Sequence, residues 1–131
     1  MNLLLDTHIW IWNDLEPCRL STSVHAALSD AKNELWLSPV SIWEVTVLIR
    51  KERLHLREEF RAWLQESVQS LQLREASFTW RVAAELQTLA TGHGDPADRF
   101  LATTAKVFDL TLVTADERLI EAPGLKILAN R

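Results

Sequence analysis

The sequence predicts a single α/β domain over residues 1–131, with a mostly parallel sheet covered by helices on both faces. Its 131 residues are 47% hydrophobic and 24% charged, a composition typical of a soluble globular domain with one core. Short apolar or β-branched runs alternate with segments of helical periodicity along the whole chain. This alternation is typical of right-handed βαβ units and therefore favours a parallel sheet.

In the first half of the chain, capping and breaking residues separate five expected elements. The continuous apolar run before Asp6 favours a fully buried strand. Ser21 is a suitable N-cap, and Ser38-Pro39 is a suitable helix start because proline is tolerated in the first helical turn. The expected elements are a strand over residues 2–5, a short helix over 8–14, a helix from 21 to about 33, a strand over 34–37 and a helix from 38 to about 51.

The second half continues the alternation. The run Leu-Thr-Leu-Val-Thr ending at Thr114 is the best β-branched strand in the chain, and Asp95-Pro96 is a suitable helix start. The expected elements are a helix over residues 56–70, a strand over 71–76, a helix capped by Ser77 that stops at Gly92-His93-Gly94, a helix from 95, a strand over 110–114, a short helical turn after Asp116 and a strand over 124–128.

Composition excludes several function classes. With three glycines, at positions 92, 94 and 124, the chain cannot contain a Gly-rich phosphate loop of the Rossmann or Walker type. A single cysteine, Cys18, excludes an intrachain disulfide and a cysteine-based zinc cluster, and fits a reducing compartment. The apolar runs are too short to span a bilayer and no basic signal region precedes them, so we expect a cytoplasmic protein without a membrane anchor. The net charge of −4 argues mildly against a nucleic-acid partner, if the acids are spread evenly.

Three acids follow the carboxyl ends of expected strands at short range, and a fourth lies at the start of an expected helix. Asp6 comes directly after the first strand, and Glu44 lies in the helix after the second. Asp98 falls in the first turn of the helix that begins at Pro96, and Asp116 follows the strand that ends at Thr114. In parallel sheets, ligands bind at the carboxyl ends of the strands. Because clustered carboxylates repel one another unless a cation lies among them, this pattern indicates a site for Mg²⁺ or Mn²⁺.

Each of these acids also has a structural interpretation. Glu44 follows Ser41 at the spacing of a helix capping box. The remaining acids can serve as a turn residue after a strand (Asp6), as helix N-caps (Asp95 and Asp116) and as a favourable charge at a helix N-terminus (Asp98). The joint placement of the acids, more than any one of them, favours a functional site.

Four segments of the chain resemble, in order, the motifs of the PIN-domain family. They are Leu3-Leu4-Leu5-Asp6-Thr7-His8, Ser38-Pro39-Val40-Ser41-Ile42-Trp43-Glu44, His93-Gly94-Asp95-Pro96-Ala97-Asp98-Arg99-Phe100-Leu101 and Leu112-Val113-Thr114-Ala115-Asp116. The chain is most similar to the VapC-type ribonuclease toxins of prokaryotic toxin–antitoxin pairs, over essentially its whole length. The resemblance implies a three-layer α/β/α PIN-like ribonuclease domain, RNA cleavage that depends on one or two Mg²⁺ or Mn²⁺ ions, a cognate antitoxin as partner, and a homodimer or a larger hetero-oligomer with that antitoxin.

The resemblance also implies roles for individual residues. The four family acids are matched by Asp6, Glu44, Asp98 and Asp116, which are expected to be both catalytic and metal-binding. Thr7 and Thr114 match small polar residues that orient carboxylates or water, and Asp95 is expected to be a helix cap or an outer member of the site.

RNA also requires positive charge. The densest basic stretch contains Arg50, Lys51, Arg53 and Arg57, with His55 among them, and Arg99 follows Asp98. Of these, Arg50, Lys51, Arg53 and Arg99 are candidate RNA contacts, although a solvated helix end explains the basic stretch equally well. Four tryptophans fit apolar stripes and are expected in the core, namely Trp36, Trp43, Trp63 and Trp80. The pattern assigns no role to His8, His93, Trp10 or Trp12.

Three other classes compete with a nuclease. A haloacid-dehalogenase-like phosphatase needs a second acid two residues after the first, where this chain has His8, and a receiver domain needs an N-terminal acidic pair that is absent. A non-catalytic RNA- or protein-binding module on the same scaffold remains the alternative. Without the four proposed ligands, 14 acids stand against 14 Lys and Arg, so the negative charge can be concentrated at one site.

Overall fold

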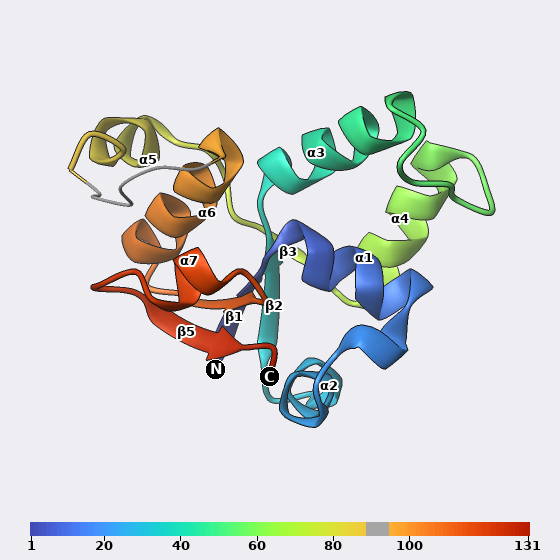
Figure 1. The fold of residues 1–131 in the computed structure, drawn as a ribbon, viewed down its shortest axis with the longest axis horizontal. Helices are drawn as coiled ribbons and strands as arrows, with labels where there is room; N and C mark the ends of the chain where they lie inside the picture. Colours follow the sequence, from blue (N-terminus) through green and yellow to red (C-terminus); the bar gives the residue numbers. More distant parts are fainter. Residues whose placement is uncertain (89–94) are drawn as a thin grey trace.

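A five-stranded, fully parallel sheet forms the centre of the computed structural model, which describes residues 1–88 and 95–131 (Figure 1). Its strands run in the order β3-β2-β1-β4-β5. They are β1 (Asn2–Leu5), β2 (Glu34–Leu37), β3 (Arg74–Glu75), β4 (Thr111–Thr114) and β5 (Lys126–Ala129). The predicted α/β class with a mostly parallel sheet is confirmed.

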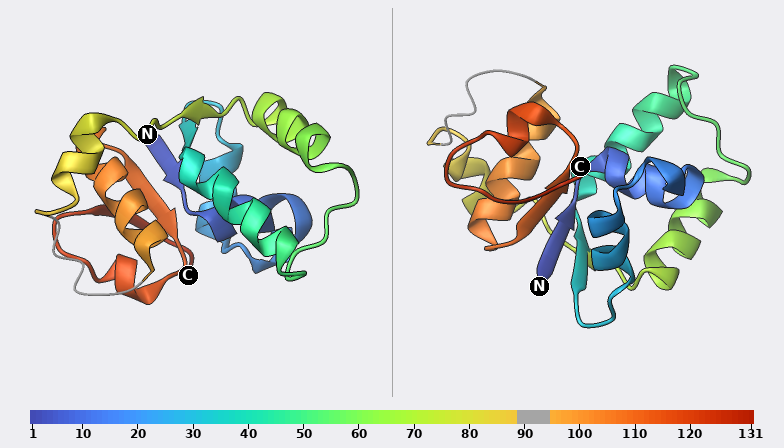
Figure 2. Two further views of the ribbon diagram at one scale, coloured as in Figure 1. Left: turned by 90° about the horizontal axis from the view of Figure 1, so that it is seen from above. Right: turned by 60° about the horizontal axis from the view of Figure 1, so that its bottom comes forward.

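Helices cover both faces of this sheet (Figures 1 and 2). The first group, on one side, consists of α1 (Thr7–Leu15), α2 (Thr22–Ser29), α3 (Pro39–Arg50) and α4 (Phe60–Ser70), with a 3₁₀ turn, η1 (Pro17–Arg19), after α1. The second group, on the other side, consists of α5 (Trp80–Glu85), α6 (Pro96–Val107) and α7 (Glu117–Ile120). The domain is therefore layered α/β/α. No helix in the described ranges is long and apolar enough to cross a membrane.

The continuous apolar run of β1 is explained by two cores, one on each face. Leu3 and Leu5 are fully buried against the first helix group, whereas Leu4 points the other way and packs with Leu101 of α6 and Leu112 of β4. Successive side chains of a strand alternate between faces. A strand buried on both faces must therefore be apolar at every position, as the sequence predicts for residues 2–5.

Two helices are shorter than predicted because side chains near their ends form local hydrogen bonds. Helix α2 ends at Ser29 rather than near residue 33, where the Asp30 carboxylate accepts the N–H of Lys32 at 2.9 Å and forms a turn. Helix α4 begins at Phe60 rather than residue 56, because Glu59 caps it by accepting two backbone N–H groups.

The segment before α5 also differs from the prediction. Helix α5 is capped by Thr79, which accepts the N–H of Val82 at 3.2 Å. The predicted cap, Ser77, instead donates its hydroxyl to Glu75, and the strand expected over residues 71–76 is reduced to the two residues of β3. The predicted helix end at residues 92–94 lies outside the described residues.

Burial of the tryptophans departs from the prediction in two cases. Trp63 is 3% exposed and Trp36 packs partly buried against the second core, as expected. Trp43 is 60% exposed and Trp80 is 95% exposed, so the prediction that these two lie in the core is wrong. Helical periodicity identifies residues that share a face, but it does not reveal whether another element covers that face. Trp10, left unassigned, is fully buried and donates its indole N–H to Ser67.

Candidate functional site

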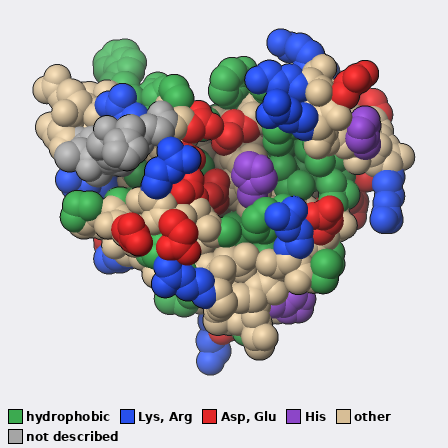
Figure 3. All heavy atoms as spheres, viewed as in Figure 1, with side chains coloured by type: hydrophobic (Ala, Val, Ile, Leu, Met, Phe, Trp, Pro, Cys, Tyr) green, Lys and Arg blue, Asp and Glu red, His purple; other side chains and the backbone are tan. Residues whose placement is uncertain are grey.

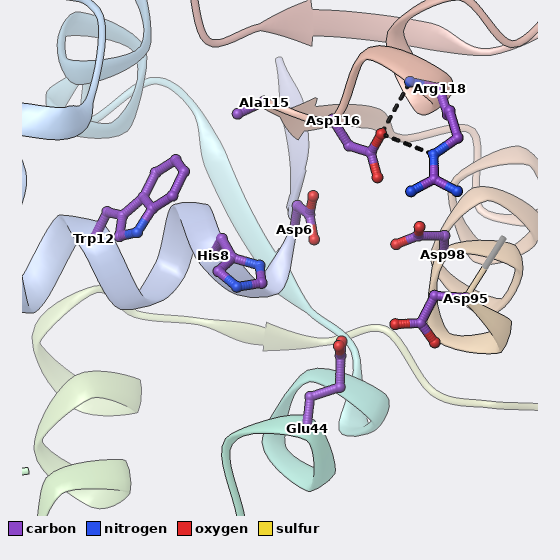
Figure 4. Close-up of a pocket in the computed structure, with 9 residues that line it drawn as sticks. All are labelled: Asp6, His8, Trp12, Glu44, Asp95, Asp98, Ala115, Asp116 and Arg118. Atoms are coloured by element: carbon purple, nitrogen blue, oxygen red, sulfur yellow. Dashed lines mark hydrogen bonds and ion pairs between the residues drawn. The ribbon is translucent and has the colours of Figure 1, made fainter. Parts of the chain in front are cut away.

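A pocket opens at the carboxyl ends of the two central strands, β1 and β4. The chain runs outward from β1 through β2 to β3 and then returns to the other side of β1 for β4 and β5, so this is the switch point where α/β sheets bind ligands. In Figure 3, acidic side chains gather in a hollow on this face. The pocket is lined by Asp6, His8, Trp12, Glu44, Asp95, Asp98, Ala115, Asp116 and Arg118 (Figure 4).

Asp6 lies between the last residue of β1 and the first residue of α1. Its N–H donates to the carbonyl of Val113 at 3.0 Å, and its carbonyl accepts the N–H of Trp10 at 3.1 Å. Although Asp6 occupies the N-cap position of α1, its carboxylate makes no capping bond. The carboxylate instead accepts the hydroxyl of Thr114 at 2.6 Å and faces the pocket (Figure 4).

Thr114 connects two of the predicted acids. Its Oγ1 accepts the backbone N–H of Asp116 at 3.0 Å and donates its proton to Oδ2 of Asp6. Because one hydroxyl serves both residues and is fully buried, it holds the Asp6 carboxylate in register with the loop after β4. The structure thus gives the Thr114 hydroxyl one hydrogen-bond partner on each side.

Glu44 reaches the pocket from α3 and is held by Thr7. The capping box predicted between Ser41 and Glu44 is wrong, because α3 starts one turn earlier and Ser38 caps it by accepting the N–H of Val40. Ser41 is therefore a buried residue inside the helix. The Thr7 Oγ1 lies 2.5 Å from Oε1 of Glu44 and 2.8 Å from Oγ of Ser41, so it ties α1 to α3.

The other acids come from the N-termini of α6 and α7. Asp95 accepts the N–H of Ala97, and Asp116 accepts the N–H of Arg118, so the structural interpretation of both as N-caps is confirmed. Both nevertheless line the pocket. Asp98 lies in the first turn of α6 and points into the space between Asp6 and Asp95 (Figure 4).

Burial and mutual repulsion disfavour ionisation of these acids. Burial, followed by the charges of Asp6, Asp116 and Asp95, raises the pKa of Asp98 to about 7. Burial is also the main cause that raises the pKa of Asp6 and of Glu44, against the opposing hydrogen bonds from Thr114 and Thr7. The pocket therefore stabilises positive charge, whether a proton or a bound cation.

The donor set fits a hard divalent ion that keeps part of its water. All of the acids offer carboxylate oxygens, which Mg²⁺ and Mn²⁺ prefer. Among the described residues, no three Asp, Glu, His or Cys side chains are close enough to enclose one ion by themselves. Mg²⁺ is commonly bound through one or two carboxylates and several waters, so this more open arrangement suits it better than zinc.

The sequence did not single out Arg118, the one Lys or Arg among the described residues that line the pocket. Its Nε lies 3.8 Å from Oδ1 of Asp116, and its only signal in the sequence is its position two residues after that acid. His8 and Trp12, which had no assigned role, also line the pocket.

The predicted basic residues are not brought to the acids. Neither Arg50 nor Lys51 lines the pocket, and Arg53 lines a neighbouring cavity. Arg99 also lies outside the lining and donates to the carbonyl of Leu86 at 3.2 Å. His93 lies outside the described residues.

Comparison with known proteins gives one family. The family model of the PIN domain matches residues 3–125. Ribonuclease VapC22 of Mycobacterium tuberculosis is 36% identical over 118 residues, covering 89% of this chain and 88% of that protein. Among solved structures, VapBC2 from Rickettsia felis bound to a promoter DNA fragment has a TM-score of 0.75 at 18% identity, over 98% of each chain. DNA-bound VapBC from Salmonella typhimurium has a TM-score of 0.68 at 18% identity, over 100% of this chain and 99% of that one. The two structures support the same fold.

The bridge formed by Thr114 leads to a stability prediction. Replacement Thr114→Val keeps the shape of the side chain but leaves the N–H of Asp116 and the carboxylate of Asp6 without their shared partner. We expect the free energy of unfolding to fall by about 1–3 kcal/mol. The control is Thr111→Val in the same strand, whose hydroxyl has no hydrogen bond among the described residues. Denaturant unfolding compares the two variants, and equal losses in both would contradict a bridging role.

The crowding of the acids predicts how the stability of the metal-free protein depends on pH. The folded chain holds the proton of Asp98 up to about pH 7, whereas the usual value is 3.8, so the folded state binds more protons between these limits. The free energy of unfolding should therefore decrease as the pH rises from about 4 to about 7. Burial of Asp6 and Glu44 acts in the same direction.

Unfolding in the presence of a chelator, at the two ends of this pH range, tests the prediction. Between these two pH values, Asp98→Asn should lose less stability than the wild type, because an asparagine side chain does not become negatively charged as the pH rises. Glu66→Gln, at an exposed acid of α4, is the control and should behave like the wild type. If the wild type and Asp98→Asn decline equally, repulsion at Asp98 does not contribute.

Proposed function

The chain is a VapC-type member of the PIN-domain family, and we propose that it is a Mg²⁺- or Mn²⁺-dependent endoribonuclease and the toxin of a toxin–antitoxin pair. The observation that carries this proposal is the convergence of Asp6, Glu44, Asp98 and Asp116 on one pocket at the switch point of the sheet. Its relative of 36% identity is a ribonuclease by name, and the acid pocket supports the same chemistry in this chain.

In this proposal the four acids hold one or two divalent ions. A bound ion of this kind lowers the pKa of water and stabilises negative charge on the phosphate and on the leaving oxygen. Asp6 is the central ligand, since Thr114 fixes its carboxylate. Glu44 and Asp98 face it from α3 and α6, and Asp116 completes the set.

The surrounding residues position the ligands and the substrate. Thr7 holds the Glu44 carboxylate, and the capping bond of Asp95 fixes the first turn of α6, which carries Asp98. In this proposal Arg118, which lines the pocket, contacts the phosphate. Water attacks phosphorus, the bond to the 3′ oxygen breaks, and that oxygen takes a proton. The products are a 5′-phosphate and a 3′-hydroxyl.

The proposed partners are RNA and a cognate antitoxin. One solved structure of the same fold, VapBC-5 from Mycobacterium tuberculosis, is described as a member of the VapBC family of toxin–antitoxin systems, which supports an antitoxin for this chain. An arm of the antitoxin that places a cation among the acids would neutralise the pocket in the same way as a metal ion, and would thereby block cleavage. A cytoplasmic location suits such a pair.

An exposed aromatic patch supports the proposed homodimer. A shallow cavity is lined by Pro39, Val40 and Trp43 of α3 together with Phe78 and Phe100, and none of the five side chains is charged. Trp43 is 60% exposed and Phe78 is 44% exposed. Contiguous exposed apolar patches mark interaction surfaces, and a patch without charge can face its own copy across a two-fold axis without repulsion. We assign this patch to the contact with a second copy of the chain.

The cleavage assay tests the catalytic proposal. Purified protein is incubated with RNA and Mg²⁺ or Mn²⁺, and the ends of the fragments are mapped. Loss of a partner that merely supports a metal ligand costs roughly 10–100-fold, so Asp6→Asn should lose at least that much. Asp30→Asn, at an exposed acid outside the pocket, should cleave normally. Cleavage by Asp6→Asn at the wild-type rate, or fragments ending in a cyclic phosphate, would rule out this mechanism. RNA binding without cleavage would favour the non-catalytic alternative.

The dimer is tested by light scattering during gel filtration. Trp43→Ser removes the most exposed aromatic ring of the patch and should shift the protein from dimer toward monomer at a given concentration. His25→Ser, at an exposed position of α2, is the control. A wild-type protein that is monomeric at all concentrations, or a Trp43→Ser variant that dimerises normally, would contradict the assignment.

A further inference from the structure

A second cavity adjoins the acid pocket and shares two of its lining residues. His8 and Trp12 of α1 line both cavities. From this shared wall the second cavity extends along α1 to Leu48 of α3 and to Leu54 and Arg57 in the segment that follows α3. We call it the α1–α3 groove. In Figure 3, hydrophobic side chains continue from the acidic hollow toward a group of Lys and Arg side chains over the end of α3.

The floor of this groove is apolar and belongs to the first core. Ile11 is 6% exposed, and Leu15, Leu48 and Leu54 pack partly buried against the same cluster. Packing against the first core holds these side chains in place. These apolar side chains, with the ring of Trp12 beside them, can contact the face of a base or a ribose without hydrogen bonds that would select one base.

Among the described residues that line the groove, basic side chains outnumber the one acid, Glu16. Arg53, His55 and Arg57 line the groove from the segment after α3, and Arg19 lines it from η1. Arg19 is held in place, because it pairs with Glu16 at 3.1 Å and its guanidinium lies 4.1 Å from the ring centre of Trp12.

Arg53 and Arg57 differ from the paired cations of the molecule. Ion pairs among the described residues involve Arg19, Arg74, Arg118, Lys126 and Arg131. No carboxylate in the described ranges lies within 4.0 Å of either Arg53 or Arg57. The backbone of Arg53 is nevertheless fixed, since its N–H donates to the carbonyl of Leu48 at 2.9 Å. The charges of Arg53 and Arg57 are thus not neutralised by any described carboxylate, and they can bind an external anion.

We infer that the α1–α3 groove binds the single-stranded RNA that flanks the scissile phosphate, with Arg53 and Arg57 on neighbouring phosphates. This inference rests on the proposed ribonuclease function, because it takes the acid pocket as the place of the scissile phosphate. A pocket of carboxylates repels the rest of an RNA backbone, so the strand needs cations beside the pocket. The shared wall at His8 and Trp12 makes this groove the direct continuation of the pocket.

The groove suits single strands better than duplexes. Its apolar floor can contact the faces of unstacked bases, which a duplex does not expose. Of the predicted RNA contacts, we keep Arg53 and add Arg57, whereas Arg50, Lys51 and Arg99 line neither cavity. An acidic protein segment is the other class of ligand that would fit a basic rim over an apolar floor, and it is an outcome of the test below.

Salt-dependent RNA binding tests the inference. A short fluorescent single-stranded RNA is titrated with Asp6→Asn protein in a chelator, so that it is bound but not cut. Arg53→Gln/Arg57→Gln should bind more weakly. Its plot of log affinity against log salt concentration should be shallower by about 1.4, because each lost phosphate contact removes about 0.7 on single strands.

The matched control is Lys32→Gln/Lys106→Gln, which makes the same change in net charge. Lys32 precedes β2 and Lys106 lies in the last turn of α6, so both are exposed at the end of the sheet opposite the pocket. This control should keep the slope of the parent protein. Equal slopes in the two double variants overturn the inference, as does a parent protein that does not bind the RNA. If RNA binding is equal but only Arg53→Gln/Arg57→Gln fails to retain a co-expressed antitoxin, the groove is a protein-docking site and the inference is likewise overturned.

A cleavage assay on the wild-type protein separates this inference from the proposed function. If the wild type cleaves RNA and the slopes are equal, the groove assignment fails while the ribonuclease function stands. If the slopes differ as expected but no metal supports cleavage, RNA binding by the groove stands and the ribonuclease proposal fails.

Discussion

The constraint on which the site depends is the position of Asp6 at the end of a strand buried on both faces. Because β2 and β4 pair with β1 on its two sides and the Asp6 N–H donates to Val113, the backbone of Asp6 cannot move toward solvent. The Thr114 hydroxyl then fixes its carboxylate. Two other acids of the pocket are connected to this point, Glu44 through Thr7 and Asp116 through its N–H bond to Thr114.

This arrangement concentrates negative charge where the fold cannot disperse it. Burial and mutual repulsion raise the pKa of Asp98 to about 7, and a protein that keeps such a cluster does so at a cost in stability unless a cation is present. The net charge of −4 therefore gives little information about affinity for RNA. The acids gather at the pocket, while Arg53 and Arg57 lie at the rim of the adjoining groove. A protein of negative net charge can in this way bind a polyanion locally.

Much of the fold could be predicted because local chemistry and tertiary structure agree. Strand β1 is apolar at successive positions because helices cover both faces of the sheet. Pro39 and Pro96 begin α3 and α6 as expected. One error arises where more than one residue fits the same sequence pattern for a helix cap. Ser38 and Ser41 both fit a cap before Glu44, and only the helix start at Pro39 decides between them. Exposure of Trp43 depends on what packs across α3, which periodicity does not encode. Asp6, Glu44, Asp98 and Asp116 do converge as expected, whereas Arg118 and the α1–α3 groove depend on contacts between distant segments.

Thermal or denaturant unfolding with and without Mg²⁺ or Mn²⁺ tests the central claim most directly, namely that the acids form a metal site. At about 100 times its dissociation constant, an ion that binds only the folded chain adds about 2.7 kcal/mol to the free energy of unfolding. We expect this gain in the wild type and its loss in Asp6→Asn/Asp98→Asn, which no longer concentrates negative charge in the pocket. No gain in the wild type, or an equal gain in the double variant, would contradict the account.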